Sequence, residues 1–592
     1  MVSKGMRQFV IFTLVVGSFL LAFIKIMPFS TTVNQHIEPF PLNHIPPSRL
    51  FMDLTRPKAS WKERTNVSVN PFCPNLSARQ RQRYYTYEDR IPNQITWTSL
   101  LNLTNPNFTS FHITKTNRNN ASKFFVCDEL RLIIQARNGL NESKTYGGDY
   151  FRAKIYTKNS TFKASSMSDG EVVDHGNGTY SALFTLKWAG LVNIQVTLVH
   201  TSEANYVLRR LQKEEVTRTH HKGRFYSKDP KKAEETFCNM DLKVLNETVG
   251  KTESCNFTDT STGSPWFCVK PKNFTCSDWV LHHNVQYKPV ISDNEKLPFT
   301  WNNRNISGSE NRIVVHRTVG NESIVHSGAL DHLPACVPQI QFEAPEVAGF
   351  YWGKNWLSAD CGIQIFRQSQ ATSLLKNKTI YFLGDSTIRQ LFEFYVKLFK
   401  LKTVPNSKDP SWFVGPTIAK DRKNNINFHF QFHGHPIGRA KWAYVSTTEY
   451  IANFIDRVKG GENTIFVLTL WAHFAAFPPW FYETRVDDVL MSLRRLQERS
   501  PRTLIIWKSA NTREHGGLDH FLKNSDWIAR DLDRRMRNKV FAHENLGFMD
   551  AWDMTNAQFE KDSVHPSGSH VENLSNKLLT YVLNHDIYDK EE

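Results

Sequence analysis

The sequence lacks the motifs through which many enzymes bind nucleotides or catalytic zinc. It contains no Gly-x-Gly-x-x-Gly stretch, no other glycine-rich loop that would cradle a phosphate, and no His-Glu-x-x-His. The histidine pairs His220-His221 and His282-His283 have no further ligands at metal-binding spacing. A nucleotide-dependent reaction is therefore not indicated, and we expect neither a metal centre nor a bound cofactor.

Cys-x-x-Cys pairs are absent as well, although the chain has eight cysteines. An even set without this spacing is typical of disulfides in an oxidising compartment rather than of zinc ligands. We expect Cys336 to pair with Cys361 near the start of the last domain, and the sequence leaves the other pairings open. The full set is Cys73, Cys127, Cys238, Cys255, Cys268, Cys276, Cys336 and Cys361.

No charge interrupts the run from Phe9 to Ile24, and no small-x-small cleavage site follows it. The apolar character continues to Phe29 if Lys25 extends to the membrane interface. This pattern predicts an uncleaved signal anchor over residues 9–29, with a cytosolic tail of residues 1–8 and a lumenal remainder. Such a chain would be a single-pass type II membrane protein of the secretory pathway, and we expect it to reside in the Golgi. A cleaved signal peptide, which would give a secreted form, is the alternative.

A dense set of Asn-x-Ser/Thr sequons supports the lumenal location. The pattern also occurs at Asn377 and Asn573. The predicted glycosylation sites are Asn66, Asn75, Asn102, Asn107, Asn120, Asn141, Asn159, Asn177, Asn246, Asn256, Asn273, Asn305 and Asn321.

The formal net charge of +16 points to acidic partners. Nucleic acid would be the usual candidate for such a charge, but a lumenal glycoprotein does not meet it. Acidic glycans or anionic membrane faces are therefore the expected partners. A solvated basic surface without a ligand is the alternative.

A chain of 592 residues should divide into roughly three to four domains. Residues 30–70 contain scattered prolines and no strong periodicity, as in a stem. Residues 71–225 are rich in short β-type runs, which predict an antiparallel sandwich. Residues 226–300 are rich in cysteine and short of apolar runs. The strands expected in the sandwich are 123–126, 130–135, 150–156, 179–186 and 191–199.

Two stretches carry a resemblance to known domains. The segment from Asp174 to Tyr180, with Trp188-Ala189-Gly190 after it, resembles an immunoglobulin-like sandwich of the filamin kind and the sandwich of neurexophilins. Pro265-Trp266-Phe267-Cys268 and Phe274-Thr275-Cys276 are similar to the cysteine-rich tail of neurexophilins. The resemblance spans residues 124–280 and implies a neurexophilin-like β-sandwich that binds a cell-surface receptor.

Residues 330–592 alternate between strand and helix patterns, which predicts a mostly parallel sheet covered on both faces. Ligands of such sheets bind beyond the carboxyl ends of the strands. The expected strands are 380–383, 428–432, 465–470, 504–507 and one near Phe548, and the expected helices are 486–499, 527–538 and 572–583.

Gly384-Asp385-Ser386 stands at one such strand end, and an amphipathic helix pattern starts at Ile388. A serine at this turn would face the free N–H groups and the positive dipole end of the helix, which suits a nucleophile. An ordinary turn with a helix cap is the alternative. Asp562-Ser563-Val564-His565 would supply the base and the acid that a serine nucleophile requires.

Together, Gly384-Asp385-Ser386-Thr387-Ile388-Arg389-Gln390 and the Asp562–His565 motif resemble the PC-esterase branch of the SGNH/GDSL hydrolases. With the neurexophilin-like region, the chain is similar to the neurexophilin and PC-esterase domain family. The resemblance implies an SGNH-like three-layer α/β domain. It implies that Ser386 is the nucleophile, that His565 is the general base and then the acid, and that Asp562 orients the imidazole.

The same resemblance suggests the oxyanion donors. The backbone N–H of Ser386 is the first, and Gly434, at the end of an expected strand, is the second. The third-strand position holds no Asn, and His473 would donate there instead. Arg389, one helical turn after Ser386, would pair with Asp385 or meet an acidic substrate, and a structural salt bridge is its alternative role.

These expectations describe a lumenal O-acetyltransferase that modifies glycan hydroxyls through an acyl-serine. Acetyl-CoA is the expected donor, and the family relatives together with the charge favour an acidic sugar such as sialic acid as the acceptor. With water as the acceptor the same residues give an O-acetylesterase. A non-catalytic glycoprotein that binds a cell-surface receptor is the alternative from another class.

Overall fold

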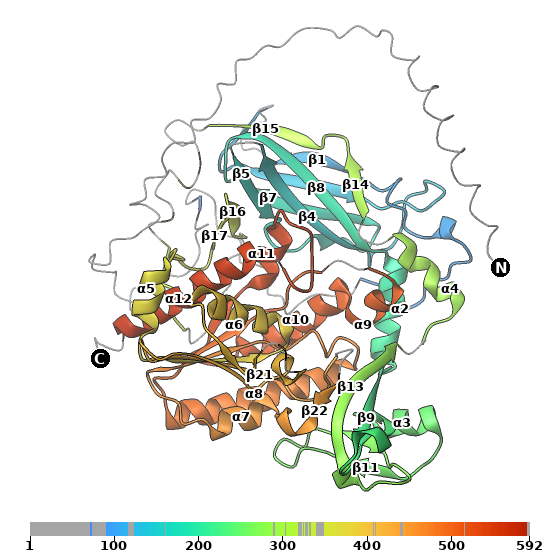
Figure 1. Cartoon of the computed structure of the whole chain (residues 1–592). Coiled ribbons are helices and arrows are strands. Elements are labelled where there is room, and N and C mark those ends of the chain that lie inside the picture. Colours follow the sequence, from blue (N-terminus) through green and yellow to red (C-terminus); the bar gives the residue numbers. More distant parts are fainter. Residues whose placement is uncertain are drawn as a thin grey trace, which may run out of the picture. The chain divides into compact units, whose positions relative to one another are not determined.

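The computed structural model describes residues 72–73, 90–116, 123–159, 162–287, 290–301, 304–317, 323, 325, 330, 333–338, 348–406, 408, 410–438, 442–513, 516–566 and 568–588 (Figure 1). All of them lie in the compact unit His44–Glu592. The predicted signal anchor and stem at residues 9–70 lie outside the described residues. Among the helices that are described, none has the length and apolar character needed to cross a bilayer.

Among the described residues, the largest sheet has twelve strands. Their bounds are β1 Ser110–Thr116, β2 Phe124–Phe125, β3 Glu129–Gln135, β4 Tyr150–Lys158, β5 Lys163–Met167, β6 Val173–Asp174, β7 Thr179–Thr185, β8 Gly190–His200, β14 Arg304–Gly308, β15 Arg312–His316, β16 Phe350–Trp352 and β17 Asn355–Leu357. The spatial order is β17-β16-β5-β4-β8-β14-β1-β3-β7-β6, and β15 joins β2 to β8. The structure confirms the strands that the sequence predicted at β2, β3, β4, β7 and β8.

Alternating apolar residues explain how this sheet builds its core. Strands β3 and β4 bury every second residue, as expected for strands with one apolar face. The buried residues Leu132 of β3 and Ile155 of β4 belong to the same core, although these strands are far apart in the sheet. The sheet therefore folds over so that β3 and β7 face β4 and β8 across one apolar layer.

The cysteine-rich segment forms a second sheet after helix α2, Ser202–Lys213. Its order is β11-β12-β10-β9-β13-β22, and its bounds are β9 Thr219–Phe225, β10 Glu234–Asn239, β11 Ser254–Asn256, β12 Phe267–Val269, β13 Trp279–Tyr287 and β22 Ala443–Tyr444. Disulfides join Cys238 to Cys268 and Cys255 to Cys276. Because β22 comes from the C-terminal part of the chain, the cysteine-rich segment is tied to the last domain.

The third sheet, as far as the structure describes it, has seven strands in the order β19-β20-β21-β18-β23-β24-β25. Strands β21, β18, β23, β24 and β25 are parallel neighbours, and β19 and β20 are antiparallel additions at one edge. The predicted mostly parallel sheet is thus present. The bounds are β18 Thr379–Gly384, β19 Thr403–Val404, β20 Thr417–Asp421, β21 Ile426–Phe432, β23 Thr464–Leu468, β24 Leu504–Lys508 and β25 Gly547–Met549.

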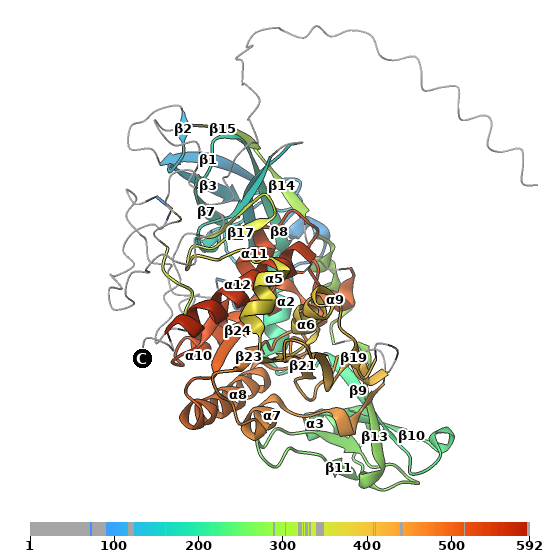
Figure 2. The same cartoon turned by 60° about the vertical axis from the view of Figure 1, so that its left-hand side comes forward.

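Helices cover both faces of this sheet (Figures 1 and 2). Ile380 and Phe382 of β18 share a core with α5 Gln368–Leu375, α6 Ser386–Leu398 and α12 Gly568–Tyr588. Leu383 points to the opposite face, where the core includes α7 Ile451–Arg457, α8 Pro479–Arg499 and α10 Asp526–Val540. The helices predicted at 486–499, 527–538 and 572–583 lie within α8, α10 and α12. The remaining helices include α3 Leu242–Val249, α4 Asp293–Lys296, α9 Leu518–Asn524 and α11 Ala551–Ala557.

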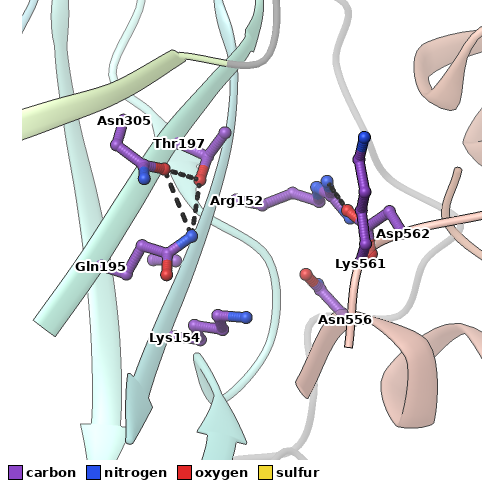
Figure 3. Close-up of a pocket in the computed structure, with 9 residues that line it drawn as sticks. Arg152, Lys154, Gln195, Thr197, Asn305, Asn556, Lys561 and Asp562 are labelled. Atoms are coloured by element: carbon purple, nitrogen blue, oxygen red, sulfur yellow. Dashed lines mark hydrogen bonds and ion pairs between the residues drawn. The ribbon is translucent and has the colours of Figure 1, made fainter. Parts of the chain in front are cut away.

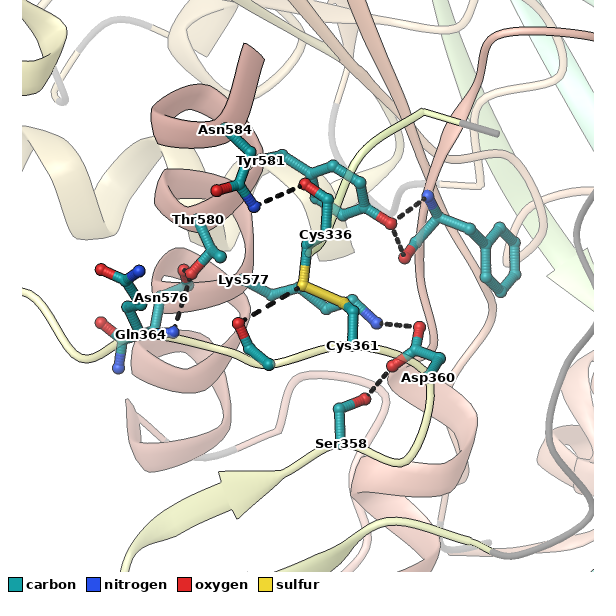
Figure 4. The surroundings of a disulfide bond; sticks show 12 residues. Cys336, Ser358, Asp360, Cys361, Gln364, Asn576, Lys577, Thr580, Tyr581 and Asn584 are labelled. Carbon is teal, nitrogen blue, oxygen red and sulfur yellow. Dashed lines mark hydrogen bonds and ion pairs between the residues drawn. A yellow bond between two sulfur atoms is a disulfide. The ribbon is translucent and has the colours of Figure 1, made fainter. Parts of the chain in front are cut away.

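The predicted disulfide between Cys336 and Cys361 is confirmed, and a fourth disulfide joins Cys73 to Cys127. Figure 4 shows that the Cys336–Cys361 segment lies against α12. Asn584 donates to the Cys336 carbonyl at 2.9 Å, and Lys577 pairs with Asp360 at 2.6 Å. This segment therefore anchors the helix that follows the His565 loop.

Candidate active site

The turn after β18 places Ser386 at the first position of α6. Gly384 has φ +147°, and a Cβ atom there would lie 2.1 Å from the Thr469 carbonyl oxygen, so the close approach requires glycine. The buried Asp385 caps the helix, since its Oδ1 accepts from the Thr387 N–H at 2.8 Å, and its Oδ2 accepts from the Ala472 N–H of the neighbouring loop at 3.1 Å. The helix cap that the sequence offered as the alternative reading is thus Asp385. Ser386 itself lies beside the free N–H groups of the helix start.

The serine and the histidine meet, as the sequence predicted. His565 Nε2 lies 2.7 Å from Ser386 Oγ, although 179 positions separate the two residues. Partial burial and the Arg389 guanidinium lower the pKa of His565 from its usual value. A neutral imidazole at this distance can accept the serine proton.

Three contacts fix the His565 loop. Asn511 Nδ2 donates to the Ser563 and Val564 carbonyls, each at 3.3 Å. Gln390 of α6 donates to the Pro566 carbonyl at 3.1 Å. The loop is therefore held both by the residues that follow β24 and by the helix that carries Ser386.

Asp562 does not take the role that the resemblance implies for it. Its carboxylate accepts from Thr512 Oγ1 at 3.0 Å and pairs with Arg152 Nη2 at 2.5 Å. Within the described residues, Asp562 makes no hydrogen bond to His565. Burial alone would raise the pKa of Asp562, but Arg152, Lys154 and Thr512 together outweigh it and the pKa is lowered. The carboxylate is thus ionised and directed away from the imidazole, because a guanidinium from β4 attracts it more strongly.

Sequence reasoning missed Arg152, Thr512, Asn511 and the buried Lys508. The last three lie at or just beyond the carboxyl end of β24, where ligands of parallel sheets bind, and this position could have indicated them. Lys508 Nζ lies 3.4 Å from Thr387 Oγ1, and burial lowers the pKa of Lys508 to about 8. No sequence pattern indicates Arg152, since it lies in a different domain, 410 positions before Asp562.

His473 is placed to act as a neutral donor. Its Nδ1 accepts from the Gly438 N–H at 3.1 Å, so the ring proton is on Nε2. Burial lowers the pKa of His473 to about 4, which keeps the ring uncharged. Gly434, the other expected oxyanion residue, has φ +84°, and a Cβ atom there would meet the Tyr450 ring at 2.6 Å. The role of both residues as oxyanion donors stays a prediction.

Arg389 has the structural role that was its alternative. Its guanidinium donates to Glu393 at 3.0 Å and to the Phe413 carbonyl at 2.9 Å, and lies over the Phe413 ring. The expected pairing with Asp385 is replaced by the pair with Glu393, one turn along the helix. Arg389 nonetheless acts on the site, because it lowers the pKa of both His565 and His473.

Most of the predicted glycosylation sites that the structure describes are exposed and so accessible to a glycan. Asn246 is half-buried, and Asn66, Asn75, Asn120 and Asn321 lie outside the described residues. The sequon at Asn573 is buried, since its side chain bonds the backbone of Lys354 and Trp356. The exposed sites are Asn102, Asn107, Asn141, Asn159, Asn177, Asn256, Asn273 and Asn305.

Two family models match the chain. Residues 356–582 match the NXPE family member 4-like C-terminal domain, and residues 100–296 match neurexophilin. The chain therefore carries a neurexophilin domain followed by an NXPE-type C-terminal domain. Ser386 and His565 both lie in the NXPE-type domain, whereas Arg152 lies in the neurexophilin domain. The Arg152–Asp562 ion pair thus links the neurexophilin domain to the loop that carries the histidine.

Proposed function

We propose that the NXPE-type domain is a serine-dependent O-acetyltransferase of the PC-esterase type that acts on glycan hydroxyls. The observation that carries the proposal is the 2.7 Å contact between Ser386 Oγ and His565 Nε2 at the carboxyl end of a parallel strand. A hydroxyl is a weak nucleophile until a base removes its proton, and this contact supplies the base.

Acetyl transfer would proceed in two balanced steps. Ser386 Oγ attacks the thioester carbonyl of acetyl-CoA, His565 takes the serine proton, and the C–S bond breaks as the proton passes to the leaving thiolate. A sugar hydroxyl then attacks the acetyl-serine, His565 takes the sugar proton, and this proton returns to Ser386 Oγ as the ester bond to the enzyme breaks. Donors at the start of α6, with Gly434 and His473, would stabilise the oxyanion in both steps.

The acceptor and the location are argued from the resemblance and from charge. PC-esterase relatives and the net charge of +16 favour an acidic sugar such as sialic acid. The sequons, the four disulfides and the N-terminal run are consistent with the Golgi lumen, or with a secreted form if that run is cleaved. Water in place of the sugar would give acetate and make the protein an O-acetylesterase.

Incubation of the full glycosylated chain with acetyl-CoA and a sialylated glycan tests the proposal. We expect an O-acetylated product that disappears in Ser386→Ala and His565→Ala and persists in Ser373→Ala, which changes an exposed serine of α5. Loss of acetyl groups from a pre-acetylated glycan, without transfer, would instead identify an esterase. Absence of both reactions, together with no labelling of Ser386 by a fluorophosphonate, would overturn the proposal.

Receptor binding by the neurexophilin domain is the second candidate function. The family match over residues 100–296 favours it, as does the diversion of Asp562 from His565. Because β14 to β17 come from residues 304–357 and complete the first sheet, the binding test requires the whole chain. Capture of a cell-surface receptor by Ser386→Ala as efficiently as by the parent, with no fluorophosphonate labelling of the parent, would decide for this role.

A further inference from the structure

A cavity of about 310 Å³ lies between the neurexophilin domain and the chain that leads to His565 (Figure 3). One wall consists of Arg152 and Lys154 of β4 with residues of β8 and β14. The other wall consists of Asn556 of α11 and of Lys561 and Asp562. Neither Ser386 nor His565 lines the cavity, so it is a site additional to the serine and the histidine.

Amides and a hydroxyl line the side formed by β8 and β14. Gln195 Nε2 donates to Asn305 Oδ1 at 3.2 Å, and Thr197 Oγ1 donates to the same oxygen at 2.8 Å. Figure 3 shows these three side chains gathered on one wall. Groups of this kind form hydrogen bonds with sugar hydroxyls, whereas an acyl chain would need an apolar lining, which this wall does not offer.

The charge of the cavity points to an anion. Lys154 extends into it, and its ammonium donates to the Gln558 carbonyl at 3.0 Å. In the part of the chain that the structure describes, Lys154 has no ion pair. Burial lowers the pKa of Lys154, even though Asp562 and Glu560 act to raise it. A desolvated ammonium without an ionic partner is unfavourable, and a bound anion would remove that cost.

Arg152 connects this cavity with the histidine loop. Its side chain is only 10% exposed, it lies between Asp562 and Asp526, and its Nε is buried with no hydrogen-bond partner in the described residues. An anion beside Lys154 would also attract this guanidinium. Any movement of Arg152 toward the anion weakens its hold on Asp562, which stands three residues before His565.

We propose that the cavity binds the anionic end of a sugar, a carboxylate or a sulfate, and that this ligand draws Arg152 from Asp562 and so frees Asp562 to orient His565. The binding half of this proposal, that the cavity holds an anionic sugar, is independent of the proposed activity. The coupling half, that this ligand frees Asp562 to orient His565, rests on it. Arg152 would then be a positioning residue. Through it, binding of an acidic glycan to the neurexophilin domain would change the orientation of His565 beside Ser386.

Titration calorimetry on the full glycosylated chain tests the binding half. The probes are glucuronate, N-acetylglucosamine 6-sulfate, inorganic sulfate and neutral N-acetylglucosamine. We expect a charged sugar to bind more tightly than either the neutral sugar or free sulfate, and the affinity to fall at least about tenfold in Lys154→Gln. Lys561→Glu, which reverses an exposed charge and leaves the core intact, should weaken binding as well.

Lys158→Gln is the matched control, since Lys158 lies on the same strand and face as Lys154 but outside the cavity. Equal binding of neutral and charged sugars, or binding that neither Lys154→Gln nor Lys561→Glu changes, would overturn the site. Binding that appears only after Ser307→Ala, which abolishes glycosylation of Asn305, would show instead that the chain's own glycan fills the cavity.

The coupling half is tested by the pKa of His565, read by NMR on histidine-labelled protein with His565→Gln to assign the signal. In the free chain the pKa of His565 is lowered, because partial burial, Arg389 and Arg513 outweigh the opposing effect of Asp385. Saturating charged sugar should raise the pKa of His565 from this lowered value in the parent and in Lys158→Gln, and should speed fluorophosphonate labelling of Ser386. An unchanged pKa in a chain that binds the sugar would overturn the coupling. A raised pKa without any labelling would leave the coupling standing and contradict the proposed activity.

Discussion

At the scale of single residues, Gly384 allows the turn that places Ser386 at the start of α6. In Gly384→Ala the new Cβ would lie 2.1 Å from the Thr469 carbonyl oxygen, a backbone atom that cannot move away cheaply. We expect the free energy of unfolding to fall by about 3 kcal/mol and Ser386 labelling to be lost. Chemical denaturation and fluorophosphonate labelling measure the two effects.

Gly568→Ala is the control for this substitution. Gly568 begins α12, and nothing lies within 4 Å of a Cβ atom there. Alanine should therefore leave both stability and labelling close to those of the parent. Comparable losses in the two variants would show that the turn after β18 has no special geometry.

His473 provides a second test at the residue scale, of the oxyanion role. His473→Ala removes the neutral Nε2 donor, and we expect acetyl transfer to slow by about 10² to 10³ fold. His473→Asn supplies a neutral amide donor in place of the imidazole and should retain more activity than His473→Ala. Equal transfer rates in the parent and in both variants, compared at the same concentration of folded protein, would show that His473 is not an oxyanion donor.

Among the site residues, the sequence indicated Ser386 and His565 because each stands in a short motif at a recognisable place. It could not indicate that Asp562 bonds Arg152 instead of His565, since Arg152 lies 410 positions away in another domain. No local pattern distinguishes a carboxylate that orients a histidine from one that pairs with a distant guanidinium. Local motifs therefore predicted the contact between Ser386 and His565, and tertiary contacts decided the partner of Asp562.

At the scale of elements, the strands and helices of the last sheet were predictable, because buried apolar runs such as β18 and β24 have clear ends. Strands β16 and β17 were not predictable, since three residues each carry too little periodicity. Strand β17 pairs with β16, and β16 pairs with β5, which lies about 180 positions earlier. Their pairing depends on the packing of Phe350 and Trp356 in buried cores. Long, periodic segments were thus predicted, and short edge strands required the tertiary structure.

Helix α12 is the element whose anchoring can be tested. Cys336→Ala with Cys361→Ala opens a loop of 25 positions, and we expect the free energy of unfolding to fall by about 3 kcal/mol. Because α12 directly follows the His565 loop, Ser386 labelling should slow as well. Thermal denaturation and labelling rates measure both effects.

The Cys73–Cys127 disulfide supplies the comparison for α12. It closes a loop of the first sheet and lies in that sheet's own core, so its removal should lower stability without slowing Ser386 labelling. A labelling rate that falls equally in both variants would mean that α12 anchoring has no particular role in holding the histidine.

At the scale of the whole molecule, a cluster of buried histidines joins the cysteine-rich sheet to the last domain. His221 of β9, His282 of β13 and His435 pack around Trp266, with ring centroids of His282 and His435 4.4 Å apart. Both nitrogens of His221 and of His282 are buried without partners in the described residues. Burial first, and then neighbouring histidines, hold the pKa of all three well below 6.5, and Arg485 also lowers that of His435.

This arrangement sets the sign of a pH dependence. The folded chain keeps the three rings neutral, whereas the unfolded chain protonates them below a pKa of about 6.5. The stability that they contribute is therefore present above about pH 6.5 and is lost progressively as the pH falls below that value. Each histidine can contribute a slope of up to about 1.4 kcal/mol per pH unit. Asp149 and Asp526 act in the opposite sense, since burial raises their pKa to about 6.

Chemical denaturation between pH 5.5 and 7.5 should accordingly show a free energy of unfolding that declines toward acid pH. His282→Phe keeps an aromatic ring in the cluster but cannot be protonated. The slope of its unfolding free energy against pH should therefore be smaller than that of the parent by up to about 1.4 kcal/mol per pH unit, the contribution of one histidine. His175→Gln changes an exposed histidine of the first domain and should leave the slope unaltered. Since the carboxylates are the same in all three proteins, only the difference in slope reports the cluster. Identical slopes for the parent and His282→Phe would mean that the buried rings do not tie the two domains together in a pH-dependent way.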